Sequence, residues 1–228
     1  MRRINMLYLI LVLQFTAAVT GQKDLYLTVG VGDDVTLSCE SLIEDQNNCE
    51  STTWIFSEST NTAVDLISRG QLGKSAGAKS DRLSVSEKCS LVIKKITEKD
   101  AGLYGCRQIR SGQIQDSSVT LSVVTMTEEK NTVDDEVKFR CSLSIYDRCP
   151  RTVKWLFQGQ AVDKNNPQLK TSQSDCSASV TFPTSHFGYT SRYNSFKCEV
   201  TDGNTREVKL FSFSPPQSSG ENMLSCVK

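Results

Sequence analysis

The sequence has few of the residues and motifs on which catalysis and metal binding depend. It contains one histidine, His186, in the stretch TSHFGYT, and it has no G-x-S-x-G motif for a serine nucleophile. No two cysteines have the short C-x-x-C spacing of zinc or redox sites. The acidic clusters at 33–34 and 134–136 lack a calcium-loop motif. We therefore expect no enzyme activity, no metal and no cofactor.

The sequence also lacks net charge and N-glycosylation sequons. Its 26 basic and 26 acidic residues cancel. An excess of basic residues is the usual electrostatic reason for binding nucleic acid or an anionic membrane surface, and that reason is missing here. We therefore expect no nucleic-acid partner.

Long apolar runs are scarce, and the only clear one lies at the N-terminus. Arg2 and Arg3 precede the apolar run LYLILVLQF and the small residues AAVTG, the pattern of a secretory signal peptide at 1–21. We expect cleavage after Gly21, with Thr20 as the alternative. The run is too short to cross a bilayer, which takes about 20 apolar residues. The chain is expected to be secreted, or to lie outside the plasma membrane if a longer form carries a membrane segment.

Cysteine is abundant by contrast, and its order repeats. Nine cysteines in an exported chain predict disulfides, and the odd number leaves at least one over. The first eight cysteines and the two tryptophans follow the order C, C, W, C, C twice. An order that is kept while the gaps vary indicates one fold used twice.

The local pattern predicts β-strands throughout. Apolar residues alternate with polar ones at 35–39, 91–93, 119–123, 137–141 and 178–182, which is typical of strands packed on one face. Many short strands separated by polar turns favour an antiparallel sandwich or barrel. No long stretch keeps a helical period, so the fold class is all-β.

The first repeat resembles the immunoglobulin fold. Cys39, Trp54 and Cys106 match its Cys…Trp…Cys framework, and DAGLYGC puts Tyr104 where the family has its tyrosine corner. The resemblance implies a Cys39–Cys106 bridge between two sheets. The spacing of 67 residues suits a variable-type domain, expected at 22–125.

The resemblance also implies a structural ion pair between Arg82 and Asp100 beneath the sandwich. An exposed pair of this kind contributes under about 1 kcal/mol.

The second repeat follows the same framework less closely. Cys141, Trp155 and Cys198 match it, but Phe196 stands where the corner tyrosine belongs. We expect a shorter immunoglobulin-like domain at 126–213, a short linker around 124–127, and a flexible polar tail at 214–228.

The remaining cysteines predict accessory bridges on this fold. The loop after the second strand and the start of the fifth strand lie at the same end of the sandwich. This predicts the pairs Cys49–Cys89 and Cys149–Cys176. Such bridges add stability, and Cys49–Cys89 also anchors the loop SLIEDQNNCEST.

Cys226 is left over by this pairing. One interpretation is that it forms an interchain disulfide in a homodimer. The other is that the tail is a spliced replacement for a stalk and membrane segment, and its cysteine is incidental. Both interpretations remain open.

Function is then expected to be recognition of an extracellular protein ligand through a surface. The candidate residues lie on the outer face of the sheet and in the loop at 107–115: Ile55, Arg107, Ile109 and Arg110. The first repeat resembles variable domains of the polymeric immunoglobulin receptor-like group and related immune-type receptors. The resemblance implies an immune cell-surface receptor ectodomain or its soluble form. Adhesion through homophilic or heterophilic contacts is the alternative.

Overall fold

The structure is a computed structural model of the whole chain. It describes residues 25–39, 49–59, 62–110, 112–146, 148–149, 151–203 and 205–213. The predicted signal peptide and the predicted tail with Cys226 lie outside the described residues.

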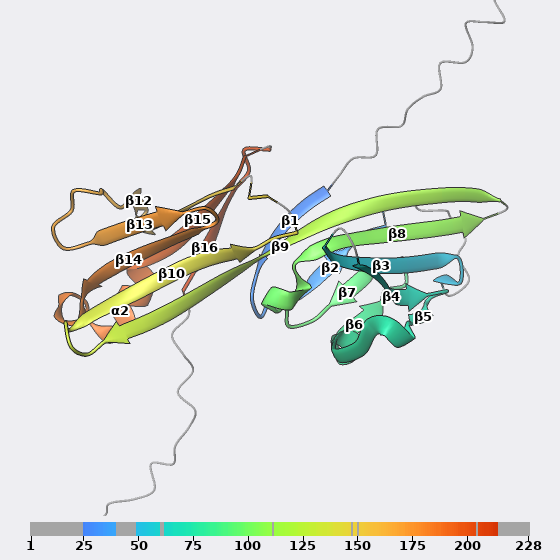
Figure 1. Cartoon of the computed structure of the whole chain (residues 1–228), viewed down its shortest axis with the longest axis horizontal. Helices are drawn as coiled ribbons and strands as arrows, with labels where there is room; N and C mark the ends of the chain where they lie inside the picture. Colours follow the sequence, from blue (N-terminus) through green and yellow to red (C-terminus); the bar gives the residue numbers. More distant parts are fainter. Residues whose placement is uncertain are drawn as a thin grey trace, which may run out of the picture.

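The chain forms two β-sandwiches in tandem (Figure 1), so the predicted all-β fold class is confirmed. The N-terminal sandwich packs a sheet of order β1-β9-β8-β3-β4-β5 against a second sheet of order β2-β7-β6. Its strands are β1 (Leu25–Gly30), β2 (Val35–Leu37), β3 (Thr52–Ser59), β4 (Thr62–Ser68), β5 (Gln71–Leu72), β6 (Leu83–Val85), β7 (Leu91–Ile93), β8 (Gly102–Arg110) and the first part of β9 (Gln113–Asn131).

The C-terminal sandwich packs a sheet of order β13-β14-β10-β9 against one of order β12-β11-β15-β16. Its strands are the second part of β9, β10 (Glu136–Ser144), β11 (Arg151–Phe157), β12 (Gln160–Ala161), β13 (Lys170–Ser174), β14 (Ser177–Pro183), β15 (Phe196–Asp202) and β16 (Val208–Ser212). This sandwich therefore lacks the additional edge strands that widen the first one, as its shorter cysteine spacing predicts.

Short helical turns connect the strands. They are η2 (Lys74–Arg82), η3 (Glu98–Asp100), η4 (Thr184–His186) and the helix α2 (Tyr189–Ser195). Of these, η3 and α2 occupy the same place in the two sandwiches, in the connection that leads into β8 and into β15.

Strand β9 belongs to both sandwiches (Figure 1). Its Leu121 pairs with Gly102 of β8, and two residues later its Val123 pairs with Ser144 of β10. The stretch LSVVTMTEEK holds no glycine or proline and is rich in β-branched residues, so nothing interrupts the strand. The linker expected at 124–127 is therefore wrong, because these residues continue the strand.

Strand β1 lies at the junction of the two sandwiches. It runs parallel to β9, with Gly30 opposite Val124, and the Val31 amide donates to the Val124 carbonyl at 2.9 Å. From the other sandwich, Lys209 Nζ donates to the Thr28 carbonyl at 3.4 Å. Because β10 pairs with β9 on its other edge, the junction is held by backbone hydrogen bonds on both edges of β9.

Each sandwich has its own hydrophobic core. The core of the N-terminal sandwich runs to Val123 and centres on Trp54 and Tyr104. The core of the C-terminal sandwich begins with Val124 and centres on Phe139. Neighbouring residues of β9 thus point into different cores, and the predicted domain limit after residue 125 stays a prediction.

Candidate functional site

Four disulfides hold the two sandwiches, in the four pairs that the sequence predicts. Their Cα–Cα distances lie within the usual range for a disulfide. They are Cys39–Cys106 at 5.6 Å, Cys49–Cys89 at 5.4 Å, Cys141–Cys198 at 6.3 Å and Cys149–Cys176 at 5.8 Å.

The two tryptophans lie beside the central bridges, as the framework implies. Trp54 pairs across the sheet with Cys106, and Trp155 pairs with Cys198. Both indoles are buried, and each indole N–H donates to a backbone carbonyl. The acceptors are Cys89 at 2.9 Å and Ala178 at 3.0 Å. Each tryptophan thereby ties its sheet to the opposite one.

The accessory bridges attach to tight turns. The sequence predicts that Cys89 lies at the start of a strand, but it lies in the turn between β6 and β7. There its amide donates to the Ser86 carbonyl at 2.9 Å. Cys176 lies in the corresponding turn between β13 and β14. Both have a positive φ of 58°. This left-handed conformation reverses the chain in a short turn, and it explains why the cysteine sits outside the strand.

Tyr104 forms the tyrosine corner that the sequence predicts. Its hydroxyl donates to the Asp100 carbonyl at 2.7 Å, and its ring packs on Phe56 with the centroids 4.9 Å apart. The residue is fully buried. Burial strongly raises the pKa of the Tyr104 hydroxyl, so the hydroxyl stays protonated and keeps donating.

Asp100 and Arg82 form the predicted ion pair, with two parallel hydrogen bonds of 2.9 and 3.0 Å. Lys79 joins them at 3.1 Å from Asp100 Oδ1. Burial on its own raises the pKa of Asp100. Hydrogen bonds from Arg82 and Thr97 and the charge of Lys79 outweigh that effect and lower the pKa to about 2. The side chain of Asp100 is 0% exposed, so this pair is structural and differs from an exposed surface pair.

Apolar side chains gather on the outer face of the sheet that contains β3, β8 and β9. Because Tyr104 and Cys106 point inward, the alternate residues of β8 point outward. The exposed isoleucines are Ile55 at 38%, Ile109 at 50% and Ile114 at 61%. Ile109 and Ile114 are directly opposite each other on β8 and β9. We call these three residues with Arg107 and Asp116 the outer patch.

Arg107 on this face is not a free cation. It pairs across the strands with Asp116 through two hydrogen bonds of 2.8 Å, from Nε and from Nη2. The hydrogen bond from Arg107 lowers the pKa of Asp116, and the same contact raises the pKa of Arg107. Asp116 was not predicted from the sequence, although its separation from Arg107 along the chain fits a cross-strand pair in the β8–β9 hairpin.

Gly105 gives Ile55 its place in the outer patch. The two residues are opposite each other on β8 and β3, and a Cβ built on Gly105 would lie 2.9 Å from Ile55 Cγ1. Ile55 thus lies across the bare glycine backbone. The register thus places apolar side chains on either side of one charge pair.

Several candidate residues lie outside the described residues. They are the side chain of Arg110, the loop residues 40–48 that Cys49 anchors, and Cys226.

Within the described ranges, no group of three or more His, Cys, Asp or Glu side chains is arranged to hold a metal ion. Of the helices described by the structure, none has the length and apolar character to span a bilayer.

Comparison with known families supports the immunoglobulin superfamily. Residues 22–124 match the model of the immunoglobulin V-set domain. This match covers the N-terminal sandwich and indicates an extracellular, receptor-like recognition module. No curated protein matches the chain.

Proposed function

We propose that the chain is an extracellular recognition protein whose outer patch binds a protein ligand. The observation that carries this proposal is the grouping of three exposed isoleucines around the Arg107–Asp116 pair on one sheet face. Single exposed apolar residues are ordinary, but a contiguous group with an arginine has the composition of an interface centre.

The geometry explains how the patch could bind. Isoleucine side chains that are already about half exposed lose water on contact without any change of backbone, and β3 and β8, which carry Ile55 and Ile109, are hydrogen-bonded on both edges. Arg107 and Asp116 satisfy each other in the free protein. A ligand that covers them therefore buries a paired charge, which avoids the cost of a single one.

The setting of this recognition is extracellular. The predicted signal peptide and the four disulfides both support export to an oxidising compartment. The tandem sandwiches and the V-set match support an immune-type receptor ectodomain, related to the polymeric immunoglobulin receptor-like group, or its soluble form. The secreted and the membrane-attached forms would present the same patch.

A binding screen tests the proposal. The purified chain is screened against an array of cell-surface proteins, and each hit is measured again with Ile109→Asp and Arg107→Glu. Each variant should weaken binding at least about tenfold, because central apolar and arginine contacts contribute about 2 kcal/mol or more.

Val208→Asp is the matched control, since Val208 is 52% exposed on β16 of the other sandwich. A ligand that is insensitive to both patch variants but sensitive to Val208→Asp would refute the proposal.

Homophilic adhesion is the second candidate function. It is favoured by the balanced charge of the outer patch. The patch carries one positive and one negative side chain, so it could face a copy of itself. Beads coated with the chain should then aggregate, and Ile109→Asp beads should not. Dimerisation through Cys226 is a separate hypothesis. It predicts a dimer on non-reducing electrophoresis that Cys226→Ser abolishes.

A further inference from the structure

The C-terminal sandwich contains a slot between its two sheets, independent of the outer patch. The slot has a volume of about 370 Å³ and lies at the edge where β11 and β12 face β13 and β14. Its apolar floor is formed by Trp155, Ala161, Val162 and Ala178. Pockets that hold small molecules begin at about this volume.

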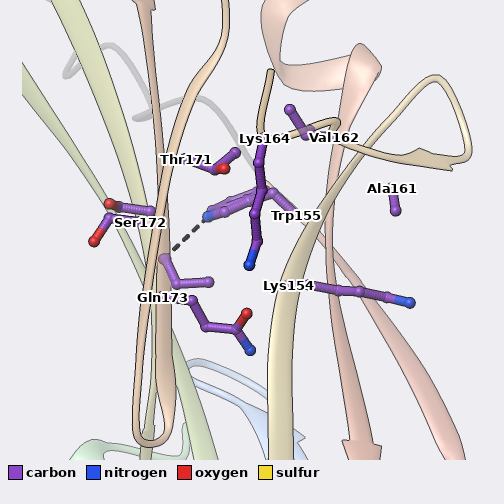
Figure 2. A pocket seen from close by; sticks show the side chains of 10 residues that line it. Lys154, Trp155, Ala161, Val162, Lys164, Thr171, Ser172 and Gln173 are labelled. Atoms are coloured by element: carbon purple, nitrogen blue, oxygen red, sulfur yellow. Dashed lines mark hydrogen bonds between the residues drawn. The ribbon is translucent and has the colours of Figure 1, made fainter. Parts of the chain in front are cut away.

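The slot exists because β13 carries polar residues where a sandwich strand normally carries apolar ones. Thr171 is opposite Val180 and Gln173 is opposite Ala178, and both partners on β14 are buried. Residues that are opposite each other on neighbouring strands point to the same face of the sheet, so Thr171 and Gln173 lie on the sandwich-facing side of β13, where Thr171 is half-buried and Gln173 is exposed. Figure 2 shows both side chains directed toward the space beside Trp155, with Ser172 directed away.

Lys164 supplies a positive charge to the lining of the slot, and the residue itself is exposed. It comes from the loop after β12, and Figure 2 shows its side chain crossing Trp155 in the view, with the ammonium toward Gln173. Across the described residues, it makes no ion pair. Lys154 points the other way and pairs with Glu199 at 2.8 Å. The one lysine directed into the slot is therefore the one without a carboxylate.

The walls of the slot are held in place before any ligand binds. On one side, Trp155 is fixed by its hydrogen bond to the Ala178 carbonyl. On the other side, the β13–β14 turn is tied by the Cys149–Cys176 bridge, and the Leu143 amide donates to the Cys176 carbonyl at 2.9 Å. A preorganised cavity of this kind costs little to order on binding.

We propose that this slot binds an acidic sugar of monosaccharide size, with its carboxylate on Lys164 and its hydroxyls on Thr171 and Gln173. A sugar ring suits the slot, because one face of the ring is apolar and can lie on the floor while its edge carries hydroxyls. The unpaired ammonium selects a negatively charged ring over a neutral one.

An NMR titration of the full secreted chain with D-glucuronate tests this site, with D-glucose as the uncharged comparator. Glucuronate should shift the backbone amides of residues 154–164 and 171–179, and glucose should bind at least about tenfold more weakly. Lys164→Gln should reduce glucuronate binding to the level of glucose. Lys197→Gln, which removes an exposed lysine from β15, should leave it unchanged.

Filling the slot provides the second measurement. Thr171→Leu should abolish the amide shifts while keeping or raising the melting temperature, because an apolar side chain there packs on the floor. The proposal is overturned if glucuronate at about 20 mM, well above a weak millimolar Kd, causes no localised shifts. It is also overturned if Lys164→Gln binds as the wild type does, or if Thr171→Leu folds and still binds.

Discussion

The two sandwiches share a disulfide framework and differ in what fills the end opposite the accessory bridge. In the N-terminal sandwich that end is polar: Tyr104 and Arg82 both hold Asp100, one through its carbonyl and the other through its carboxylate. In the C-terminal sandwich that end combines aromatic rings with a buried ion pair, in which Arg192 Nη1 lies 3.6 Å from Glu128 Oε1. Tyr193 of α2 stacks on Phe139, and its hydroxyl donates to Glu128 at 2.6 Å.

This difference shows which parts of the fold the framework determines. In both sandwiches the tryptophan pairs with the second central cysteine, and its indole donates to a backbone carbonyl of the opposite sheet or its turn. The connection into the strand that bears the last central cysteine has no such constraint. There a buried tyrosine ties the end of the core to a polar group in both sandwiches, but it comes from different positions of the chain and meets different partners.

Truncating a core side chain should give the largest difference in stability between the two sandwiches. Phe139 and Leu37 each lie two residues before the first central cysteine of their sandwich, and both are buried. Phe139 contacts five aromatic rings. Phe139→Ala should therefore cost about 3–5 kcal/mol, and Leu37→Ala should cost toward the lower end of about 2–5 kcal/mol.

Hydrogen exchange followed by mass spectrometry measures the free energy of opening of each sandwich separately. Each substitution should act mainly on its own sandwich. Equal losses in both sandwiches from either variant would contradict the separation into two cores.

Lowering the pH should remove the stability that Asp100 contributes to the N-terminal sandwich. Its pKa is about 2 in the fold and about 3.9 when unfolded, so its contribution is complete above pH 4 and is lost as pH falls from about 4 to about 2. The shift of about two pH units corresponds to about 2–3 kcal/mol. Asp100→Asn should remove that much stability from the N-terminal sandwich at pH 7.

The difference between wild type and Asp100→Asn should shrink toward pH 2, as read by urea unfolding at each pH. Asp81→Asn, a substitution at an exposed neighbour, should behave as the wild type does. A difference that stays constant from pH 7 to pH 2 would rule out the Asp100 ion pair as its source.

Exchanging tyrosine and phenylalanine should have the smallest effect. Tyr104→Phe removes one hydrogen bond to the Asp100 carbonyl and should cost about 1 kcal/mol. Phe196→Tyr places a hydroxyl among the rings of Phe157, Phe182 and Phe187, and should also destabilise by about 1 kcal/mol or more. Thermal unfolding measures both. A stabilising Phe196→Tyr would mean that the C-terminal sandwich can accept a tyrosine corner after all.

The features that the sequence predicts well are those that its resemblance to the immunoglobulin fold implies. Cysteine order and DAGLYGC carry that resemblance, and it implies the bridge partners, the role of Tyr104 and the Arg82–Asp100 pair. Residues that meet only through register were missed, as Asp116 shows. The continuity of β9 was also missed, although the absence of glycine and proline around Val124 was a usable signal. Helix α2 was missed because seven residues are too few to show a helical period.

The slot was missed for a different reason. The slot arises from the polar sequence KTSQS of β13. Without the register of its neighbours, this sequence predicts only an exposed edge strand. Only the register with β14 shows that Thr171 and Gln173 lie on the sandwich-facing side of β13, and only the fold brings Lys164 to the same slot.

The strand shared by the two sandwiches has a mechanical consequence. If the ligand pulls on the outer patch while the far end of the chain is tethered, tension passes along β9 from one sandwich to the other. The hydrogen bonds to β1 and β10 lie across that direction on opposite edges, so they resist in shear and must break together. The junction should transmit force or torque from one sandwich to the other with little relative movement between them.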